Sequence, residues 1–264
     1  MNRNHPCNEL DQEVEQCLAG NPGTFSVLVH RLSGSDFHYE RLADRVVPSA
    51  SLIKILIMVE VFQQSTEGLL SLSERLEASP SKMVPFGLLP LLREPAYSIW
   101  DLLVYMMTLS DNTAANLLID RLGMTCVNAL ADRHGLPQTR LRRKMMDFQA
   151  RLENRENETS LADMARLMTL LHRDAVDSPE SCASMRGIMM TECSAAGLRR
   201  CAPSSWPMLR KTGELEGIRH DLCVLYAPEG TLLMGVFSTG LHHEHEAEEL
   251  TVALGRLMIK YGLG

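Results

Sequence analysis

Ser51 and Lys54 are the first residues of this sequence that could carry out a reaction. They stand three positions apart at the start of a segment that predicts a helix over Leu52–Gln64. Residues three apart on a helix lie on the same side, so the hydroxyl and the amine come together. The predicted helix is apolar on nearly every side and therefore buried, and burial lowers the pKa of a lysine. Such a lysine could accept the serine proton and create a nucleophile. For this pair alone, however, a core lysine beside a helix cap is the simpler explanation.

Two further motifs carry polar side chains suited to the same chemistry. Ser110-Asp111-Asn112 stands between two predicted helices, where all three residue types also serve as helix caps. Lys211-Thr212-Gly213 stands just before the second group of predicted strands. Its lysine and threonine suit a carboxylate, and its glycine lets the backbone approach a ligand closely. Each motif alone is explained by local structure, a cap in the first case and a solvated strand end or turn in the second.

The order and spacing of the three motifs resemble a known superfamily. Ser110 follows Ser51 by 59 residues, and Lys211 follows Ser110 by 101 residues. Ser-x-x-Lys, Ser-Asp-Asn and Lys-Thr-Gly in this order resemble the serine β-lactamases and penicillin-binding proteins, most closely the class A-like branch. The resemblance covers almost the whole chain, and Thr24–Phe62 is similar to the first hairpin and nucleophile helix of that family. It implies a β-lactamase-like α+β fold, with an antiparallel sheet from both chain ends, flanking helices and an inserted helical lobe.

The resemblance also implies a role for each motif residue. Ser51 would be the acylated nucleophile and Lys54 its proton acceptor, while Ser110 would pass a proton to the leaving nitrogen. Asn112 would bind the substrate's amide group and help to position Lys54. Lys211 would tune Ser110 as well as bind substrate. Thr212 would bind a substrate carboxylate, and Gly213 would let the strand approach the substrate. The backbone N–H groups of Ser51 and Glu214 would form an oxyanion hole. Arg219 would make a second carboxylate contact, although an exposed strand position explains it as well.

The sequence departs from the class A pattern where deacylation is expected. Class A β-lactamases activate water with a glutamate on an Ω-shaped loop, yet no Glu-x-x-x-Asn element occurs between the second motif and the helix predicted from Ser160. Asp147 is the nearest candidate base and is one methylene shorter than glutamate. A loop or salt-bridge role for Asp147, beside the basic run Arg140–Lys144, is an equally good explanation. We expect that basic run to be a solvated face rather than a nucleic-acid site.

Hydrophobic periodicity predicts the elements that position the motifs. Strand patterns occur near both chain ends, and helical patterns dominate between them, which indicates α+β rather than alternating βαβ organisation. We expect one domain over 1–264, with a sheet lobe of about 1–56 plus 205–264 and a helical lobe of about 57–204. The predicted helices are Glu9–Leu18, Leu52–Gln64, Ser98–Thr108, Thr113–Leu122, Ser160–His172, Pro179–Met190 and Glu244–Tyr261, and the predicted strands are Thr24–Leu32, Phe37–Leu42, Asp221–Tyr226 and Leu232–Thr239.

Composition excludes several classes of function. The 264 residues are 45% hydrophobic and 22% charged, with a net charge of −7, so we expect no binding to nucleic acid or to a membrane. Seven cysteines without a Cys-x-x-Cys pair indicate reduced thiols. No cofactor is expected, and no metal either, since His242–His245 lacks the His-Glu-x-x-His spacing. The first residues show no signal-peptide pattern, which favours a cytoplasmic protein over the mature form of an exported one. The sequence does not define the oligomeric state, and a monomer is the simplest expectation.

The resemblance and the missing glutamate together define three hypotheses. The leading one is an active-site-serine enzyme that forms an acyl-enzyme on a small carboxylate-bearing amide, lactam or ester and hydrolyses a β-lactam-like ring. The alternative is cytoplasmic acyl transfer or intramolecular ring closure, including β-lactam formation in secondary metabolism, because a positioned amine can outcompete water. The third is a binder or sensor that is acylated once and does not turn over.

Overall fold

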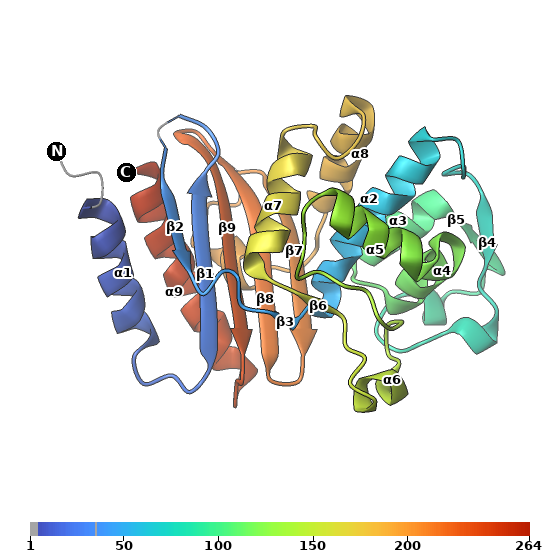
Figure 1. Ribbon diagram of the computed structural model, residues 1–264, viewed down its shortest axis with the longest axis horizontal. Coiled ribbons are helices and arrows are strands. Elements are labelled where there is room, and N and C mark those ends of the chain that lie inside the picture. Colours follow the sequence, from blue (N-terminus) through green and yellow to red (C-terminus); the bar gives the residue numbers. More distant parts are fainter. Residues whose placement is uncertain (1–4, 35) are drawn as a thin grey trace.

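The main sheet joins strands from both ends of the chain (Figure 1). The computed structural model describes residues 5–34 and 36–264, and within them the sheet is antiparallel with the order β2-β1-β9-β8-β7. Strand β1 pairs with β9 from Thr24 opposite Thr239 to Arg31 opposite Leu232, which ties the two chain ends together. The expected fold class is confirmed. The strands are β1 (Thr24–Arg31), β2 (His38–Arg41), β7 (Met208–Leu215), β8 (Ile218–Ala227) and β9 (Gly230–Thr239).

Strand β7 is the sheet element that the hydrophobic pattern missed. Its sequence, MLRKTGEL, has charged residues in the middle and reads as a polar turn, but Arg210 and Lys211 are almost fully buried. Buried charges with partners therefore replace the usual apolar residues of a strand. The connection between the predicted strands Thr24–Leu32 and Phe37–Leu42 includes residue 35, which lies outside the described residues.

Helices cover both faces of the sheet (Figure 1). Helices α1 (His5–Leu18) and α9 (Glu244–Leu263) pack together on one face, where their apolar residues join those of β1 and β9 in one hydrophobic cluster. Helix α7 (Leu161–His172) packs on the opposite face. Each helix presents one apolar stripe to the sheet, as expected of amphipathic helices.

The segment between β2 and β7 is mainly helical. Its central helix, α2 (Ile53–Thr66), is buried over almost its whole length and forms the middle of the larger hydrophobic cluster. Helix α5 was not predicted; it begins directly after Gly123. The other elements of this segment are α3 (Ile99–Thr108), α4 (Asn112–Leu122), α5 (Met124–Arg133), α6 (Phe148–Leu152) and α8 (Pro179–Met189), with the short pairs β3 (Val47–Pro48) with β6 (Glu158–Thr159), and β4 (Arg75–Glu77) with β5 (Ala96–Ser98).

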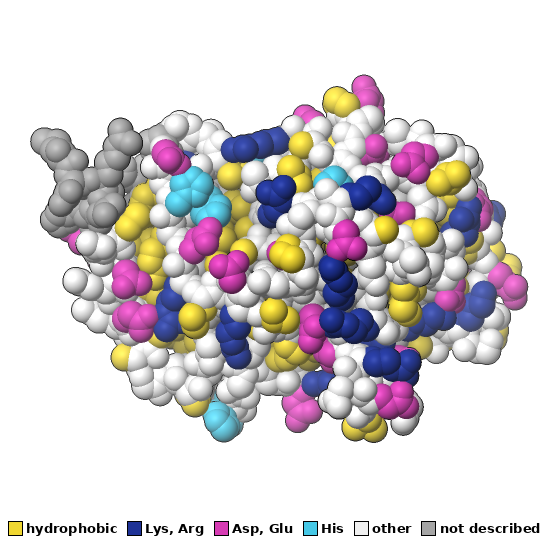
Figure 2. Space-filling model, viewed as in Figure 1, with side chains coloured by type: hydrophobic (Ala, Val, Ile, Leu, Met, Phe, Trp, Pro, Cys, Tyr) yellow, Lys and Arg dark blue, Asp and Glu magenta, His cyan; other side chains and the backbone are white. Residues whose placement is uncertain are grey.

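The basic run of residues 140–144 is neutralised by ion pairs. Arg143 bonds Glu156 at 2.6 Å, and Lys144 bonds Asp120 at 2.5 Å. Arg140 and Arg142 have carboxylate partners as well. Figure 2 shows the same pattern over one face, where Lys and Arg lie among Asp and Glu. None of the helices in the described ranges combines the length and apolar character that a bilayer crossing needs.

Candidate active site

Ser51 lies where a short 3₁₀ helix, Ala50–Leu52, continues into α2. Ala50 has a φ of 46°, a left-handed conformation that is uncommon for a residue with a Cβ and turns the chain sharply into the helix. The Lys54 amine lies 3.1 Å from the Ser51 hydroxyl oxygen. The hydroxyl–amine contact predicted from the helical spacing is therefore present.

Four oxygen atoms surround the Lys54 amine. They are the Ser51 hydroxyl at 3.1 Å, the Ser110 carbonyl at 2.6 Å, the Ser110 hydroxyl at 3.1 Å and the Asn112 side-chain carbonyl at 2.8 Å. A charged amine has three protons and no lone pair, so it can only donate, whereas a neutral amine has two protons and one lone pair and can accept the proton of one hydroxyl. Burial lowers the pKa of Lys54 well below its usual range; Lys211 lowers it further, and Asp111 opposes the shift. Lys54 is thus suited to accept a proton from Ser51.

Ser110 lies between two lysines. Its hydroxyl oxygen is 3.1 Å from the Lys54 amine and 3.1 Å from the Lys211 amine. Ser110 has a φ of 54°, and this strained backbone directs both its hydroxyl and its carbonyl toward Lys54. A hydroxyl placed between two amines can relay a proton between them.

Asp111 fixes the turn that carries Ser110 and Asn112. Its buried carboxylate caps α4 by accepting the Ala114 N–H at 2.8 Å. It also accepts the backbone N–H groups of Leu88 at 2.6 Å and Leu89 at 2.8 Å. These contacts hold the loop before α3 against the motif. Asp111 is therefore structural, and its neighbours carry the reactive groups.

Strand β7 brings the third motif to the nucleophile. Burial lowers the pKa of Lys211 to about 8, while Glu192 opposes the shift. A Cβ on Gly213 would lie 3.0 Å from the Ala50 Cβ and 3.1 Å from the Ser51 nitrogen. Only glycine lets the strand approach the nucleophile this closely. The three motifs, distant in sequence, thus meet at one point.

Arg219 and Asp147 lie outside this polar set. The Arg219 guanidinium is 3.5 Å from a carboxylate oxygen of Glu214 and 3.5 Å from one of Glu248. Asp147 is exposed and caps α6, where it accepts the Ala150 N–H at 3.0 Å. Among the described residues, no hydrogen bond joins Asp147 to Ser51 or Lys54. Its role as a deacylation base stays a prediction.

A buried ion network behind β7 was not predicted. Arg210 donates to both carboxylate oxygens of Asp221 at 2.8 Å and to Glu192 at 3.0 Å. The hydroxyl of Thr212 donates to the other oxygen of Glu192 at 3.4 Å. Arg210 was visible next to Lys211 in the sequence, but nothing in the sequence pattern indicates that Glu192 reaches the strand from the loop after α8.

His220 is a second buried group near the nucleophile that sequence reasoning missed. Its ring stacks on Phe237, and its Nε2 lies 2.9 Å from the carbonyl oxygen of Pro48, shortly before Ser51. Burial lowers the pKa of His220 to about 4, so the ring is neutral near pH 7. His220 therefore joins β8 to the segment that leads into the nucleophile.

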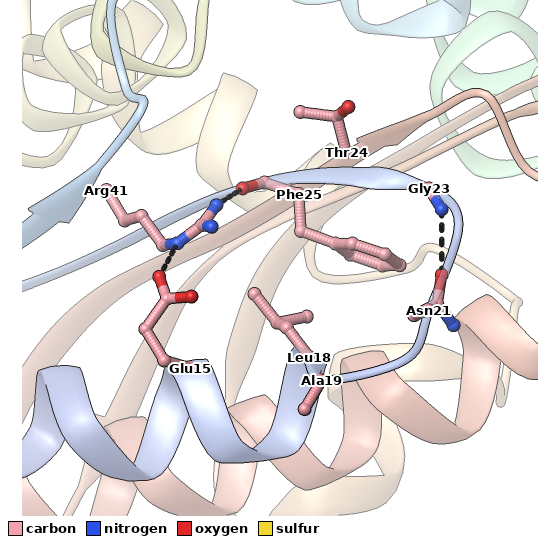
Figure 3. Close-up of a pocket in the computed structure, with 8 residues that line it drawn as sticks. All are labelled: Glu15, Leu18, Ala19, Asn21, Gly23, Thr24, Phe25 and Arg41. Carbon is pink, nitrogen blue, oxygen red and sulfur yellow. Dashed lines mark hydrogen bonds and ion pairs between the residues drawn. The ribbon is translucent and has the colours of Figure 1, made fainter.

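The hollow drawn in Figure 3 is a different place. It has a volume of about 220 Å³ and lies between the end of α1 and the start of β1. Its charged groups already have partners, since Arg41 bonds Glu15 at 2.5 Å and the Phe25 carbonyl at 2.5 Å. Within the described part of the chain, no group of His, Cys, Asp and Glu is arranged to hold a metal ion; the side chains of 244–246, in the histidine-rich segment, lie outside the described residues.

The fold and the serine–lysine–serine–lysine set define a serine hydrolase of the β-lactamase type. The chain belongs to the β-lactamase enzyme family, whose family model matches residues 9–261. A β-lactamase of Rhodobacter capsulatus is 28% identical over 204 residues, covering 75% of this chain and 69% of that protein. The crystal structure of a β-lactamase from Sphaerobacter thermophilus is 27% identical, with a TM-score of 0.89 and coverage of 97% and 98% of the two chains. A mutant of PBP-A, solved as an acyl-enzyme complex with penicillin G, is 25% identical, with a TM-score of 0.89 and 98% of each chain covered.

Proposed function

We propose that this protein forms an acyl-enzyme at Ser51 on a small amide, lactam or ester and hydrolyses it, with a β-lactam-like ring as the leading substrate. The observation that carries the proposal is the continuous chain of contacts from Ser51 through Lys54 and Ser110 to Lys211, with each step at 3.1 Å. The relatives that bear the name β-lactamase support the same chemistry. The carboxylate expected on the substrate is considered further below.

The contacts support a sequence of balanced proton transfers. Ser51 Oγ attacks the carbonyl carbon while its proton passes to Lys54 Nζ. The C–N bond of the substrate then breaks, and the leaving nitrogen takes the proton of the Ser110 hydroxyl. Lys54 returns its extra proton to Ser110 across their 3.1 Å contact. The result is an ester on Ser51 and an amine, with both lysines restored to their starting protonation states.

A second outcome, slow release or transfer to an amine, is favoured by one observation. In the described part of the chain, no carboxylate hydrogen-bonds to Ser51 or Lys54, and the carboxylate that acts most on Lys54, Asp111, already accepts three backbone N–H groups. No carboxylate that could activate water is therefore held against Ser51 or Lys54 by a hydrogen bond among the described residues. Under these conditions an external amine, or an amine of the substrate itself, can compete with water.

Intact-mass measurements with penicillins, cephalosporins and D-amino-acid esters test both outcomes. We expect the wild type to gain the mass of one acyl group, Ser51→Ala to gain none, and Ser73→Ala, an exposed serine, to behave as the wild type. Rapid product formation in water supports hydrolysis, and release only on addition of an amine supports transfer. The same labelling of wild type and Ser51→Ala would refute the proposal.

A further inference from the structure

Carboxylates surround the Lys211–Thr212 pair and oppose its positive charge. The groups that act most strongly on Lys211 include the carboxylates of Glu192, Glu214 and Asp221 and the guanidinium of Arg210. Arg219, the other cation expected near the substrate, lies 3.5 Å from both Glu214 and Glu248. Negative charges therefore match or exceed positive charges around the pair.

Glu192 is a carboxylate that hydrogen-bonds directly to this pair, through the Thr212 hydroxyl. Its side chain is only 7% exposed and comes from the loop between α8 and β7. One oxygen bonds Arg210 at 3.0 Å, and the other accepts the Thr212 hydroxyl at 3.4 Å. Because Asp221 already occupies two guanidinium nitrogens of Arg210, that arginine is shared by two carboxylates. The Glu192 charge is thus only partly offset by Arg210.

A substrate carboxylate bound to Thr212 would come close to Glu192. It would take over the Thr212 hydroxyl at about 2.7 Å, which leaves its oxygen within about 6 Å of the Glu192 carboxylate. Like charges at that separation in a partly buried site weaken binding by about tenfold to a hundredfold. An uncharged group makes the same hydrogen bonds without repulsion from Glu192, and a cationic group gains attraction to Glu192.

We propose that Glu192 sets the charge selectivity of the Lys211–Thr212 subsite and directs the enzyme toward acyl donors whose group there is uncharged or cationic, such as an ester, an amide or an amine-bearing derivative. This inference rests on the proposed acyl-enzyme function and narrows its substrate class. Glu192 acts as a specificity-determining residue that does not touch the reacting atoms.

The test compares one lactam in three charge states. Benzylpenicillin, its methyl ester and its 2-(diethylamino)ethyl ester present an anion, a neutral group and a cation at the same position. Acylation rate constants are measured by intact mass on one protein sample, so that an inactive fraction cancels from their ratios. For the wild type we expect the neutral and cationic esters to react at least as fast as the acid, and a preference for the acid of more than about tenfold would overturn the inference.

Three variants separate charge from structure. Glu192→Gln keeps the shape; its amide oxygen can still accept from Arg210, and its NH2 group can donate to the Thr212 hydroxyl oxygen. This variant should raise the acid-to-ester ratio about tenfold. Glu192→Asp keeps the charge and should retain the wild-type preference. Glu216→Gln removes an exposed carboxylate from the turn between β7 and β8, and it should change the acid-to-ester ratio by less than about twofold. If Glu192→Gln does not fold, the wild-type substrate series still decides the outcome.

The failures of the two proposals are distinguishable. Adducts from all three lactams with a ratio unchanged in Glu192→Gln would refute the role of Glu192 and leave the acyl-enzyme proposal intact. No adduct on Ser51 from any of the three would refute the acyl-enzyme proposal and this inference with it.

Discussion

At the scale of single residues, the two buried lysines differ in the charged and polar groups that surround their amines. Lys54 is enclosed by four oxygen atoms and has its pKa lowered first by burial and then by Lys211. Lys211 is also buried, but the Glu192 carboxylate opposes the lowering of its pKa and so favours the charged form. Two identical side chains 3.1 Å from the same hydroxyl are thereby separated into a proton acceptor and a cation.

The pKa of Lys211 predicts how acylation depends on pH. Below about pH 8 the amine is protonated and positive, and above about pH 8 it loses its proton. We expect the acylation rate to fall as the pH rises through about 8, because the charge beside Ser110 is lost. Pre-steady-state rates from pH 6 to 10 measure this. Lys211→Arg keeps the charge and should remove the falling limb; an unchanged limb would assign it to another group.

The sequence predicted the reactive residues better than their partners. Ser51, Lys54 and Ser110 could be assigned because motif type, order and spacing occur together. Glu192, Arg210 and His220 could not, because their roles depend on which loop and strand lie next to each other in space. Asp111 was ambiguous for a related reason, because a helix cap and a catalytic neighbour can have the same residue type. Its structural role becomes visible only in its contacts, one that caps α4 and two that hold a loop.

At the scale of elements, the site depends on how closely β7 approaches the start of α2. Gly213 has no side chain, and the space of a Cβ there is already taken by the Ala50 Cβ and the Ser51 nitrogen. Hydrophobic periodicity predicted the other four strands of the main sheet and most helices, but it missed β7, α5, α6 and the short strands β3 to β6. Strand β7 was missed because its buried Arg210 and Lys211 break the pattern that periodicity detects, and their burial depends on partners far away in sequence.

The close approach of β7 predicts a large effect from one methyl group. Gly213→Ala places a Cβ 3.1 Å from the Ser51 nitrogen, so the strand and the nucleophile must move apart. We expect at least about a hundredfold loss of acylation and a loss of about 1–3 kcal/mol in the free energy of unfolding.

Gly187→Ala is the matched control, because nothing lies within 4 Å of a Cβ at this position in α8. It should gain up to about 1 kcal/mol from helix propensity and keep full acylation. Denaturant unfolding and labelling kinetics measure both effects. Equal behaviour of the two variants would contradict the role assigned to Gly213.

At the scale of the whole molecule, the first helix and the last helix share one hydrophobic cluster with the sheet. Because β1 lies between β2 and β9, and β7 at the other edge carries Lys211, the chain ends and the site belong to one hydrogen-bonded sheet. The resemblance implied this arrangement; the hydrophobic pattern alone gave only strands at both ends without their order.

Shared packing predicts cooperative unfolding. Leu10→Ala removes a fully buried side chain of α1 and should lower the unfolding free energy by about 2–5 kcal/mol. The near-UV and far-UV circular dichroism signals and the Ser51 labelling activity should all be lost at one temperature, lower than that of the wild type.

Leu152→Ala, at a position on α6 that is 79% exposed, is the control and should change the unfolding free energy by less than about 0.5 kcal/mol. Two separate transitions in Leu10→Ala would show that the helical segment folds independently of the sheet.

The set of oxygens around Lys54 has a consequence for how much substrate one molecule can process. The hydrogen-bond partners of the Lys54 amine are hydroxyl, carbonyl and amide oxygens, and none of these four partners is a carboxylate. If acylation of Ser51 is faster than deacylation, each protein molecule consumes about one equivalent of substrate before deacylation limits further reaction. The capacity of a cell or a reaction vessel would then scale with the number of protein molecules present, and synthesis of new chains, rather than turnover, would set the rate of removal.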